Sequence, residues 1–555
     1  MHRSAQRRSV QCRLVQSLCR SPRTLSSVRR GAAALLIAAA GIASLLDVAV
    51  ARAQALNGEV RTLLSNAKLS GSGVVASVSV VDCQTGTVLA SVDDRVPVTP
   101  ASNIKLLTSA TALLVLGKDF AFTTKFVRSG DKLIIVGDGD PGLADPQLLA
   151  DMKLSLDDLL GQIVMQIGKE TGEKIREVVV DDRVFDKDQV HPTWPKNQLD
   201  AWYCAPVSGV NFYTNVVEVF VGAGSRTGAP PAVRTLPSGS AIEIRNTAKT
   251  VTADNTDIRI NRADGKNVFS ISGSVAARGV IDKPYEVTVH EPGMLLGQVL
   301  AERLMKAGLT APLPTTGAAA VHSAMPIVRF AGAEEVFDVT KVAAMIKTPL
   351  MVALSRCNVN SHNLYAEALL KRVGFATSGQ QGSWSNGAAV VRMKISELLG
   401  PEAGDVSMAD GSGMSQDNRV TTYLLTHWMA AISNLRDPET SSIFASSMAD
   451  MEAEKIAKRF HGRKLDNRLT AKTGFIRGVQ GLSGYLIHPE TGRRVAYSVI
   501  LNHTDKAPAG AKIKDFHEEV VVAADKWLTR NPGSPAVRSA PAPVVIVPSD
   551  AVPPK

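Results

Sequence analysis

The stretch Pro100-Ala101-Ser102-Asn103-Ile104-Lys105 decides how this chain is interpreted. It opens an apolar helical run, Leu106 to Leu116, which Gly117 ends. A serine and a lysine three positions apart lie on one face of a helix, so the lysine amine can reach the serine hydroxyl. That hydroxyl is a weak nucleophile until a base takes its proton, and a lysine with a lowered pKa is such a base. The stretch therefore predicts Ser102 as nucleophile and Lys105 as its general base.

A Ser-x-x-Lys pattern is weak evidence by itself, because the chain holds two further matches. Ser65 to Lys68 runs into a Gly/Ser segment, and Ser129 to Lys132 is typical of a hairpin turn. The context of Ser102 differs: two predicted strands, residues 73–81 and 87–91, precede the helix. A nucleophile at a helix N-terminus lies where backbone N–H groups stabilise a developing oxyanion.

Two further motifs follow in order, Ser361-His362-Asn363 and Lys472-Thr473-Gly474. Together the three motifs resemble those of the penicillin-recognising serine enzymes, Ser-x-x-Lys, Ser-Asp-Asn and Lys-Thr-Gly. His362 stands where that pattern has an aspartate, and Phe475 stands where a small or hydroxylated residue is usual.

The spacing of the motifs indicates which group of these enzymes the chain resembles. Ser361 follows Ser102 by 259 positions, whereas class A β-lactamases have only a short segment there. Such a large insertion is similar to the D-alanyl-D-alanine carboxypeptidases of the penicillin-binding protein 4 (DacB) type, peptidase family S13. The stretches 137–143, 180–186 and 410–415 support this family, and the resemblance runs from about residue 56 to 530.

The resemblance implies an α/β (α+β) fold: a transpeptidase-like, β-lactamase-like domain with an antiparallel sheet flanked by helices and a large multi-domain insertion. We expect a split catalytic domain and an insertion that carries a nested β-rich subdomain. A signal peptide would precede them and a Pro-rich disordered tail would follow. In chain order the signal is 1–55, the catalytic domain 56–118 and 344–530, the inserted domain 119–215 and 284–343, the nested subdomain 216–283, and the tail 531–555.

The same resemblance implies the roles of the site residues. Ser102 forms the acyl-enzyme and Lys105 takes its proton. Ser361 passes a proton to the leaving amine, and Asn363 orients Lys105 and the substrate amide.

The remaining expected site residues bind substrate. Lys472 and Thr473 would bind the terminal carboxylate, and Gly474 would let the edge strand approach the ligand. The backbone N–H of Phe475 would complete the oxyanion hole with that of Ser102. Asp200, just before Ala205-Pro206, is a candidate for contacting the side-chain amine of the substrate, and a surface carboxylate is an equal alternative.

The net charge of +10 does not indicate a nucleic-acid partner. Residues 1–55 hold nine arginines and one acid, so the remainder carries only +2. The arginines, the apolar stretch 31–46 and the small residues around 51–55 predict an export signal. No other segment predicts a membrane span, so we expect a periplasmic protein. Cys83, Cys204 and Cys357 form no metal-binding pattern, and we expect them buried and unpaired.

These patterns predict a serine-type D-Ala-D-Ala carboxypeptidase or DD-endopeptidase that acts on peptidoglycan stem peptides and is acylated by β-lactams. Covalent catalysis by serine needs no metal or organic cofactor. Two alternatives stay open at this point: a penicillin-binding wall protein with weak turnover, and a β-lactamase.

Overall fold

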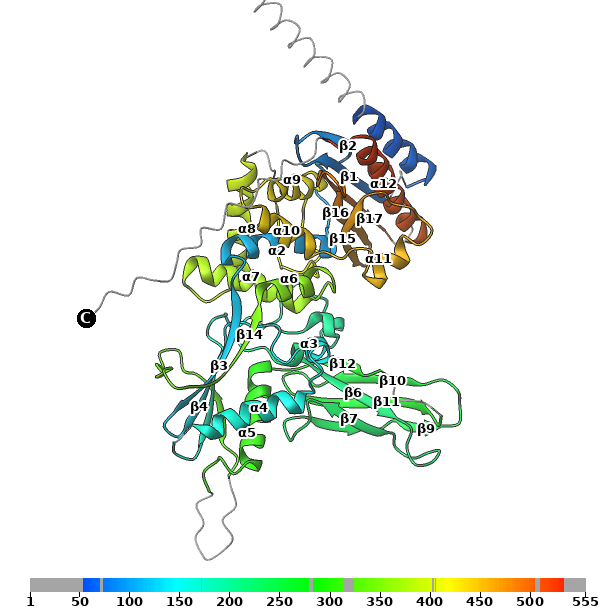
Figure 1. Cartoon of the computed structure of the whole chain (residues 1–555). Helices are drawn as coiled ribbons and strands as arrows, with labels where there is room; N and C mark the ends of the chain where they lie inside the picture. The colour runs from blue at the N-terminus through cyan, green and yellow to red at the C-terminus, as the bar shows by residue number, and fades with distance from the viewer. Residues whose placement is uncertain are drawn as a thin grey trace, which may run out of the picture.

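The protein is described from a computed structural model over residues 53–69, 73–170, 172–278, 283–312, 324–401, 404, 406–504 and 510–533. The predicted signal peptide lies outside these ranges except for residues 53–55, and the predicted tail lies outside them except for 531–533. Figure 1 shows two regions, one containing β1, β2 and β15–β17 and the other containing the insertion.

A five-stranded antiparallel sheet, in the order β15-β16-β17-β1-β2, organises the first region. The sheet joins two segments that lie far apart in the sequence. Strand β1 pairs with β17, with Val74 opposite His503 at one end of the ladder and Asp82 opposite Val495 at the other. This places β15 at the sheet edge, next to the helical turn that carries Ser102. The strands are β1 (Val74–Asp82), β2 (Val88–Val92), β15 (Arg468–Ile476), β16 (Val479–Ile487) and β17 (Arg494–His503).

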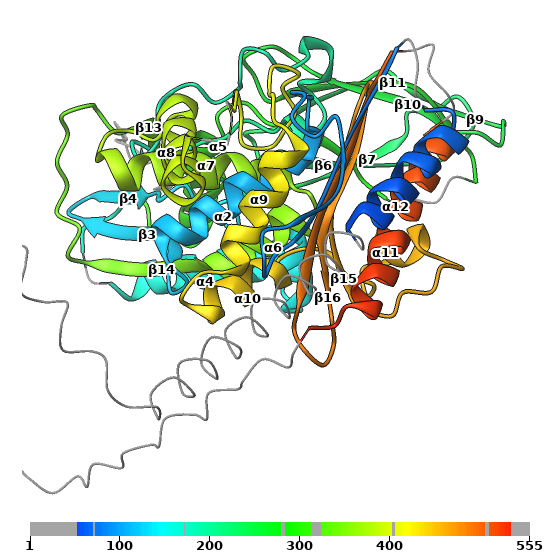
Figure 2. The ribbon, with the colours of Figure 1, turned by 90° about the horizontal axis from the view of Figure 1, so that it is seen from above.

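Both faces of this sheet are covered by helices, as Figure 2 shows. Along β1, Val78 and Val80 join the core formed with α12 and the helix over residues 53–66. The alternate residues Ser77 and Ser79 bond the hydroxyls of Thr422 and Thr426 in α9, at 2.8 and 2.7 Å. Side chains along β1 therefore alternate between an apolar face toward α12 and a hydroxyl-bearing face toward α9.

The helical layer carries two of the three motifs. Its elements are η1 (Ala101–Ile104), α2 (Lys105–Leu116), α6 (Leu350–Asn358), α7 (Asn363–Ser378), α8 (Trp384–Leu399), α9 (Thr422–Ser433) and α10 (Pro438–Ser446). Helices α11 (Glu454–Arg459) and α12 (Gly510–Arg530) lie on the opposite face of the sheet. Gly117 ends α2 with a φ of 82°, a conformation that favours glycine.

The insertion is built on a second five-stranded sheet, in the order β13-β5-β4-β3-β14. Helices α4 and α5 share its core (Figure 1). Ser155 and Asp158 form a reciprocal cap at the start of α4. The elements are β3 (Ala121–Ser129), β4 (Lys132–Val136), α3 (Pro146–Asp151), α4 (Leu156–Lys169), β5 (Glu177–Asp181), η2 (Lys196–Gln198), η3 (Trp202–Cys204), η4 (Tyr213–Asn215), α5 (Pro292–Lys306), β13 (Ile327–Phe330) and β14 (Val342–Pro349).

Short strands follow residue 215, in the region where we predicted a β-rich subdomain. They form one sheet in the order β12-β6-β7 and another in the order β10-β11-β8, with β9 also on β11. The strands are β6 (Val216–Gly222), β7 (Ala232–Leu236), β8 (Glu243–Asn246), β9 (Lys249–Val251), β10 (Asp257–Arg262), β11 (Val268–Ala276) and β12 (Tyr285–Thr288).

Two strands cross the boundaries expected from the sequence. The expected return to the catalytic domain at 344 falls within β14, which pairs with β3 as far as Pro349. The ladder therefore extends the inserted sheet to the first residue of α6. Likewise β12 lies beyond the expected limit at 283 and pairs with β6.

Asp145 ties the insertion to the helices behind the site. It is fully buried and caps α3, and its Oδ2 accepts from Arg356 Nε and Nη2 at 2.9 and 2.8 Å and from Tyr365 Oη at 2.5 Å. Arg356 in turn accepts the backbone N–H of His362 at its carbonyl, at 3.1 Å. One buried carboxylate thus braces the turn that carries the second motif.

Among the described residues, no helix combines the length and apolar character needed to cross a bilayer.

Replacing this brace should destabilise the protein. Asp145→Ala leaves the nearly buried Arg356 guanidinium without its partner, which should lower the free energy of unfolding by about 3–5 kcal/mol. Asp151→Ala, at the exposed end of the same helix, should change it by less than about 0.5 kcal/mol. Urea unfolding of both variants measures this, and equal losses would contradict the account of Asp145.

Candidate active site

Ser102 lies in η1, the 3₁₀ turn that leads directly into α2, and its side chain is partly exposed. The preceding Ala101 has a φ of 46°, which is unusual for a residue with a side chain. A neighbouring loop makes room for this turn: a Cβ at Gly413 would lie 1.9 Å from the carbonyl oxygen of Ala101. The nucleophile candidate is therefore presented by a strained turn packed tightly against glycine.

Lys105 is buried and contacts three oxygens. Its Nζ lies 3.0 Å from Ser102 Oγ and donates to Asn363 Oδ1 at 2.8 Å and to the Ser412 carbonyl at 2.6 Å. A neutral amine has two hydrogens and one lone pair, and two of the three oxygens can only accept. The arrangement therefore directs the lone pair of a neutral Lys105 at the Ser102 hydroxyl.

Burial lowers the pKa of Lys105 to about 8, although the negative charges of Glu367 and Asp410 act in the opposite direction. At pH 7 roughly one-tenth of the amine is then neutral, against roughly 0.04% for an ordinary lysine. The pKa is thus matched to a base that works near neutral pH.

The structure brings Ser361 and Asn363 together with the other two motifs. Ser361 has a φ of 59° and accepts a hydrogen bond from Lys472 Nζ at 2.7 Å. Asn363 begins α7, and its Nδ2 donates to the Tyr203 carbonyl at 2.7 Å. The amide thus holds Lys105 with one end and the insertion with the other.

His362 takes no part in this network. Its ring packs against those of Trp202 and Tyr365, with centroids 5.5 and 5.2 Å away. Burial, aided by the charge of Arg356, lowers the pKa of His362 to about 3, so the imidazole is neutral. The departure from the usual aspartate is therefore accommodated away from Ser102.

Lys472, Thr473 and Gly474 lie on the edge strand β15. Lys472 is buried and also donates to the Thr473 carbonyl at 2.9 Å. Burial and the nearby Lys105 and Lys455 hold its pKa well below the usual range. A substrate carboxylate placed here would supply the missing counter-charge.

The need for glycine at position 474 has a local cause that we did not predict. A Cβ there would lie 2.3 Å from Asn103 Nδ2, and one at Gly481, its partner across the ladder, would lie 2.2 Å away. Asn103, the residue after Ser102, therefore packs directly against the backbone of Gly474 and Gly481. Phe475, by contrast, leaves 74% of its surface exposed beside the site.

Sequence reasoning missed the support behind Lys105. Glu367 is buried and accepts from the backbone N–H groups of Gly411 and Ser412, both at 2.9 Å, and from Trp384 Nε1 at 2.8 Å. It thereby holds the backbone of Ser412, the residue whose carbonyl binds Lys105. Its position four residues after Asn363, on the same face of α7, is the signal that could have identified it.

Asp200 is not joined to this network. Its Oδ2 accepts the backbone N–H of Arg262 at 3.2 Å, and the Arg262 guanidinium lies 3.9 Å from Oδ1. The segment after it does reach the site, through Trp202 and Tyr203. The surface-carboxylate alternative therefore fits the contacts of Asp200 better than a substrate contact does.

The described residues contain no cluster of three or more His, Cys, Asp or Glu that could hold a metal ion. Cys83, Cys204 and Cys357 are buried and unpaired, and burial raises the pKa of the Cys357 thiol to about 11. Burial likewise raises the pKa of Cys83 and of Cys204, so all three thiols are protonated at neutral pH.

The chain is similar to known proteins over most of its length. The model of the D-Ala-D-Ala carboxypeptidase 3 (S13) family matches residues 56–522. The chain is 30% identical over 485 residues to a D-alanyl-D-alanine carboxypeptidase of an Actinomadura species, covering 84% of each. It is 25% identical over 468 residues to a carboxypeptidase of Mycobacterium tuberculosis, covering 80% of this chain and 83% of the relative.

The fold is also similar to that of a solved structure. Penicillin-binding protein 4 (DacB) of Haemophilus influenzae superposes with a TM-score of 0.66 at 19% identity, covering 83% of this chain and 98% of that one. The family match spans both halves of the split domain and the insertion between them. This chain therefore belongs to the D-Ala-D-Ala carboxypeptidase (S13) family of serine peptidases.

Proposed function

We propose that this protein is a serine DD-peptidase that cleaves D-Ala-D-Ala or cross-linking D-amino-acid bonds in peptidoglycan stem peptides, with Ser102 as nucleophile. The observation that carries the assignment of roles is the contact set of Lys105. Two carbonyl oxygens accept hydrogen bonds from the Lys105 amine. Ser102 Oγ lies 3.0 Å from the same nitrogen, where the lone pair of the neutral amine can face it.

In the first half of the reaction, Ser102 Oγ attacks the D-alanyl carbonyl as Lys105 takes its proton. The negative charge that develops on the carbonyl oxygen is stabilised by the backbone N–H groups of Ser102 and Phe475. The C–N bond then breaks, and the proton that Lys105 took passes through Ser361, which is bonded to Lys472, to the leaving amine, so Lys105 is neutral again. The product is an ester on Ser102.

In the second half, water attacks this ester and gives up a proton to Lys105. The carbonyl–Oγ bond breaks, and the freed Ser102 oxygen is reprotonated.

Lys472 and the Thr473 hydroxyl bind the carboxylate on the leaving side. A β-lactam offers an amide and a carboxylate in the same relation, so it acylates the same serine.

The location of the substrate implies export. The arginine-rich, apolar leader of residues 1–55 would direct the chain to the periplasm and be removed there. Peptidoglycan stem peptides are then the substrates and β-lactams the covalent inhibitors.

Benzylpenicillin should mark the nucleophile. The purified protein should gain one penicilloyl group per chain, on the peptide that contains Ser102, because slow deacylation traps the ester. The Ser102→Ala variant should gain none. Intact-mass and peptide-mass measurements test both points.

Other outcomes of this measurement separate the alternatives. Penicillin destroyed without a trapped adduct would favour a β-lactamase. Neither adduct nor turnover would favour a wall-binding protein and contradict the proposed role of Ser102.

The pH dependence of acylation should follow Lys105. Because the reactive form is the neutral amine and its pKa is about 8, the acylation rate constant should rise about tenfold per unit below pH 8 and level off above it. Stopped-flow acylation by a chromogenic β-lactam between pH 5.5 and 9.5 measures the profile. A rate that is independent of pH from 6 to 9 would exclude Lys105 as the base.

A further inference from the structure

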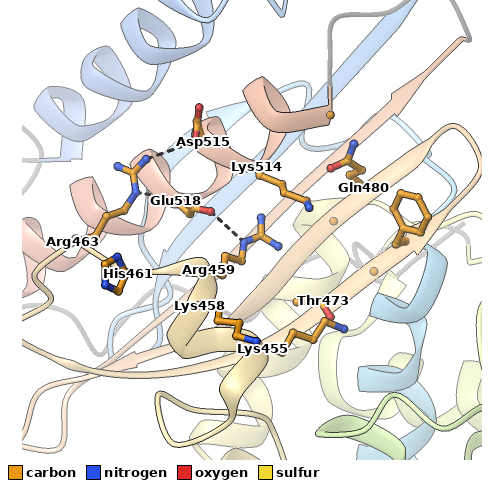
Figure 3. Close-up of a pocket in the computed structure, with 15 residues that line it drawn as sticks. Lys455, Lys458, Arg459, His461, Arg463, Thr473, Gln480, Lys514, Asp515 and Glu518 are labelled. Atoms are coloured by element: carbon orange, nitrogen blue, oxygen red, sulfur yellow. Dashed lines mark hydrogen bonds and ion pairs between the residues drawn. The ribbon is translucent and has the colours of Figure 1, made fainter. Parts of the chain in front are cut away.

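A cavity of about 1180 Å³ adjoins the active site, between strands β15 and β16 and helices α11 and α12 (Figure 3). Thr473, Gly474 and Phe475 form part of its wall, so it begins at the third motif. The proposed mechanism uses only the edge of this space. Its remaining walls carry side chains to which neither the family motifs nor the mechanism gives a role.

Cations predominate in these walls. Five lysines and arginines line the cavity, against two carboxylates, Asp515 and Glu518. The lysines and arginines are Lys455, Lys458, Arg459, Arg463 and Lys514.

Three of the five cations are already paired. Glu518 lies 3.5 Å from Arg459 Nε and 2.8 Å from Arg463 Nε, and Lys458 pairs with Glu454 on its own helix. Glu518 is nearly buried, so it fixes both arginines and has little capacity left for a ligand cation. These three cations therefore already have acidic partners.

Lys455 and Lys514 are different. Neither has an ion pair or side-chain hydrogen bond within the described part of the chain, and they project from α11 and α12 toward the same space (Figure 3). Partial burial and the charges of Arg459 and Lys514 lower the pKa of Lys455. Two cations that repel each other beside a reaction site would be stabilised by a shared anionic ligand.

The position of these lysines indicates which anion. Lys455 lines the same cavity as Thr473, the residue next to Lys472, and its charge helps to hold the pKa of Lys472 below the usual range. In the proposed function, Lys472 and Thr473 hold the carboxylate of the residue just after the scissile bond. Any chain that continues beyond that residue would pass Thr473 into the cavity, and the exposed Phe475 ring offers it an apolar surface.

We propose that this cavity binds the carboxylates of a leaving group longer than D-alanine, with Lys455 and Lys514 as the recognising cations. The inference rests on the proposed function and specifies its substrate. A cross-linked stem peptide leaves as a peptide with further carboxylates, whereas a terminal D-alanine carries only one. The enzyme therefore favours cross-linked peptides whose leaving side carries free carboxylates.

Two synthetic cross-linked peptides test the proposal. They share the acyl side and the residue after the scissile bond, and they differ in whether the more distant carboxylates of the leaving side are free or amidated. The readout is the ratio of kcat/KM for the two peptides at low salt, which cancels changes in the chemical step. The wild-type protein should favour the free acid by roughly tenfold, since each exposed charge contact contributes modestly.

Variants assign the effect to the two lysines. In Lys455→Gln/Lys514→Gln, the ratio should fall below about threefold. Lys512→Gln is the matched control, because Lys512 is an exposed lysine on the same helix that does not line the cavity, and it should keep the wild-type ratio. Benzylpenicillin labelling of Ser102 in each variant establishes that the site is folded.

The outcomes distinguish this inference from the proposed function. A wild-type ratio near one, or a tenfold ratio that survives the double substitution, overturns the cavity proposal while penicillin labelling leaves the DD-peptidase assignment intact. If neither peptide is cleaved and Ser102 is not labelled, the proposed function fails and this inference fails with it.

Discussion

The structure depends above all on one buried amine. Lys105 contacts an oxygen from each of three segments that are far apart in the chain: Ser102, Asn363 and Ser412. Removing this amine from water lowers its pKa toward neutrality, and the two carbonyl acceptors orient what remains of its hydrogen-bonding capacity. Helix α2, helix α7 and the 410–415 loop therefore together position the Lys105 amine beside the Ser102 hydroxyl.

Contacts from the sheet and from the insertion fix these three segments in place. On the sheet side, Asn103 packs onto Gly474 and Gly481, so the nucleophile turn and the edge strand fix one another. On the insertion side, the buried Asp145 carboxylate binds Arg356 and Tyr365 and so braces the turn before Asn363. The insertion is thus part of the machinery that positions the catalytic groups, as well as a candidate surface for substrate.

Much of this could be predicted from the sequence, because the informative signals are local. The helix after Ser102, the α4 helix and the hairpin of β16 and β17 have clear periodicity and turn residues, and the three motifs name residues that the structure brings together. The missed features depend on contacts between distant segments. Neither the partner of Asp200 on β10, nor the support of Glu367, nor the pairing of β14 with β3 follows from local pattern. The fit of Asn103 to two glycines requires the register of a ladder that the sequence does not reveal.

The central claim is that the pKa of Lys105 is low enough for an appreciable fraction of the amine to be neutral near physiological pH. NMR titration of the protein with ¹³C-labelled lysine side chains, with the Lys105 signal assigned by its loss in Lys105→Arg, measures this directly. The account predicts a Lys105 resonance that titrates with a pKa near 8. A Lys105 that titrates near the ordinary value of about 10.4 would contradict it, because the amine would then be almost wholly protonated when the enzyme acts.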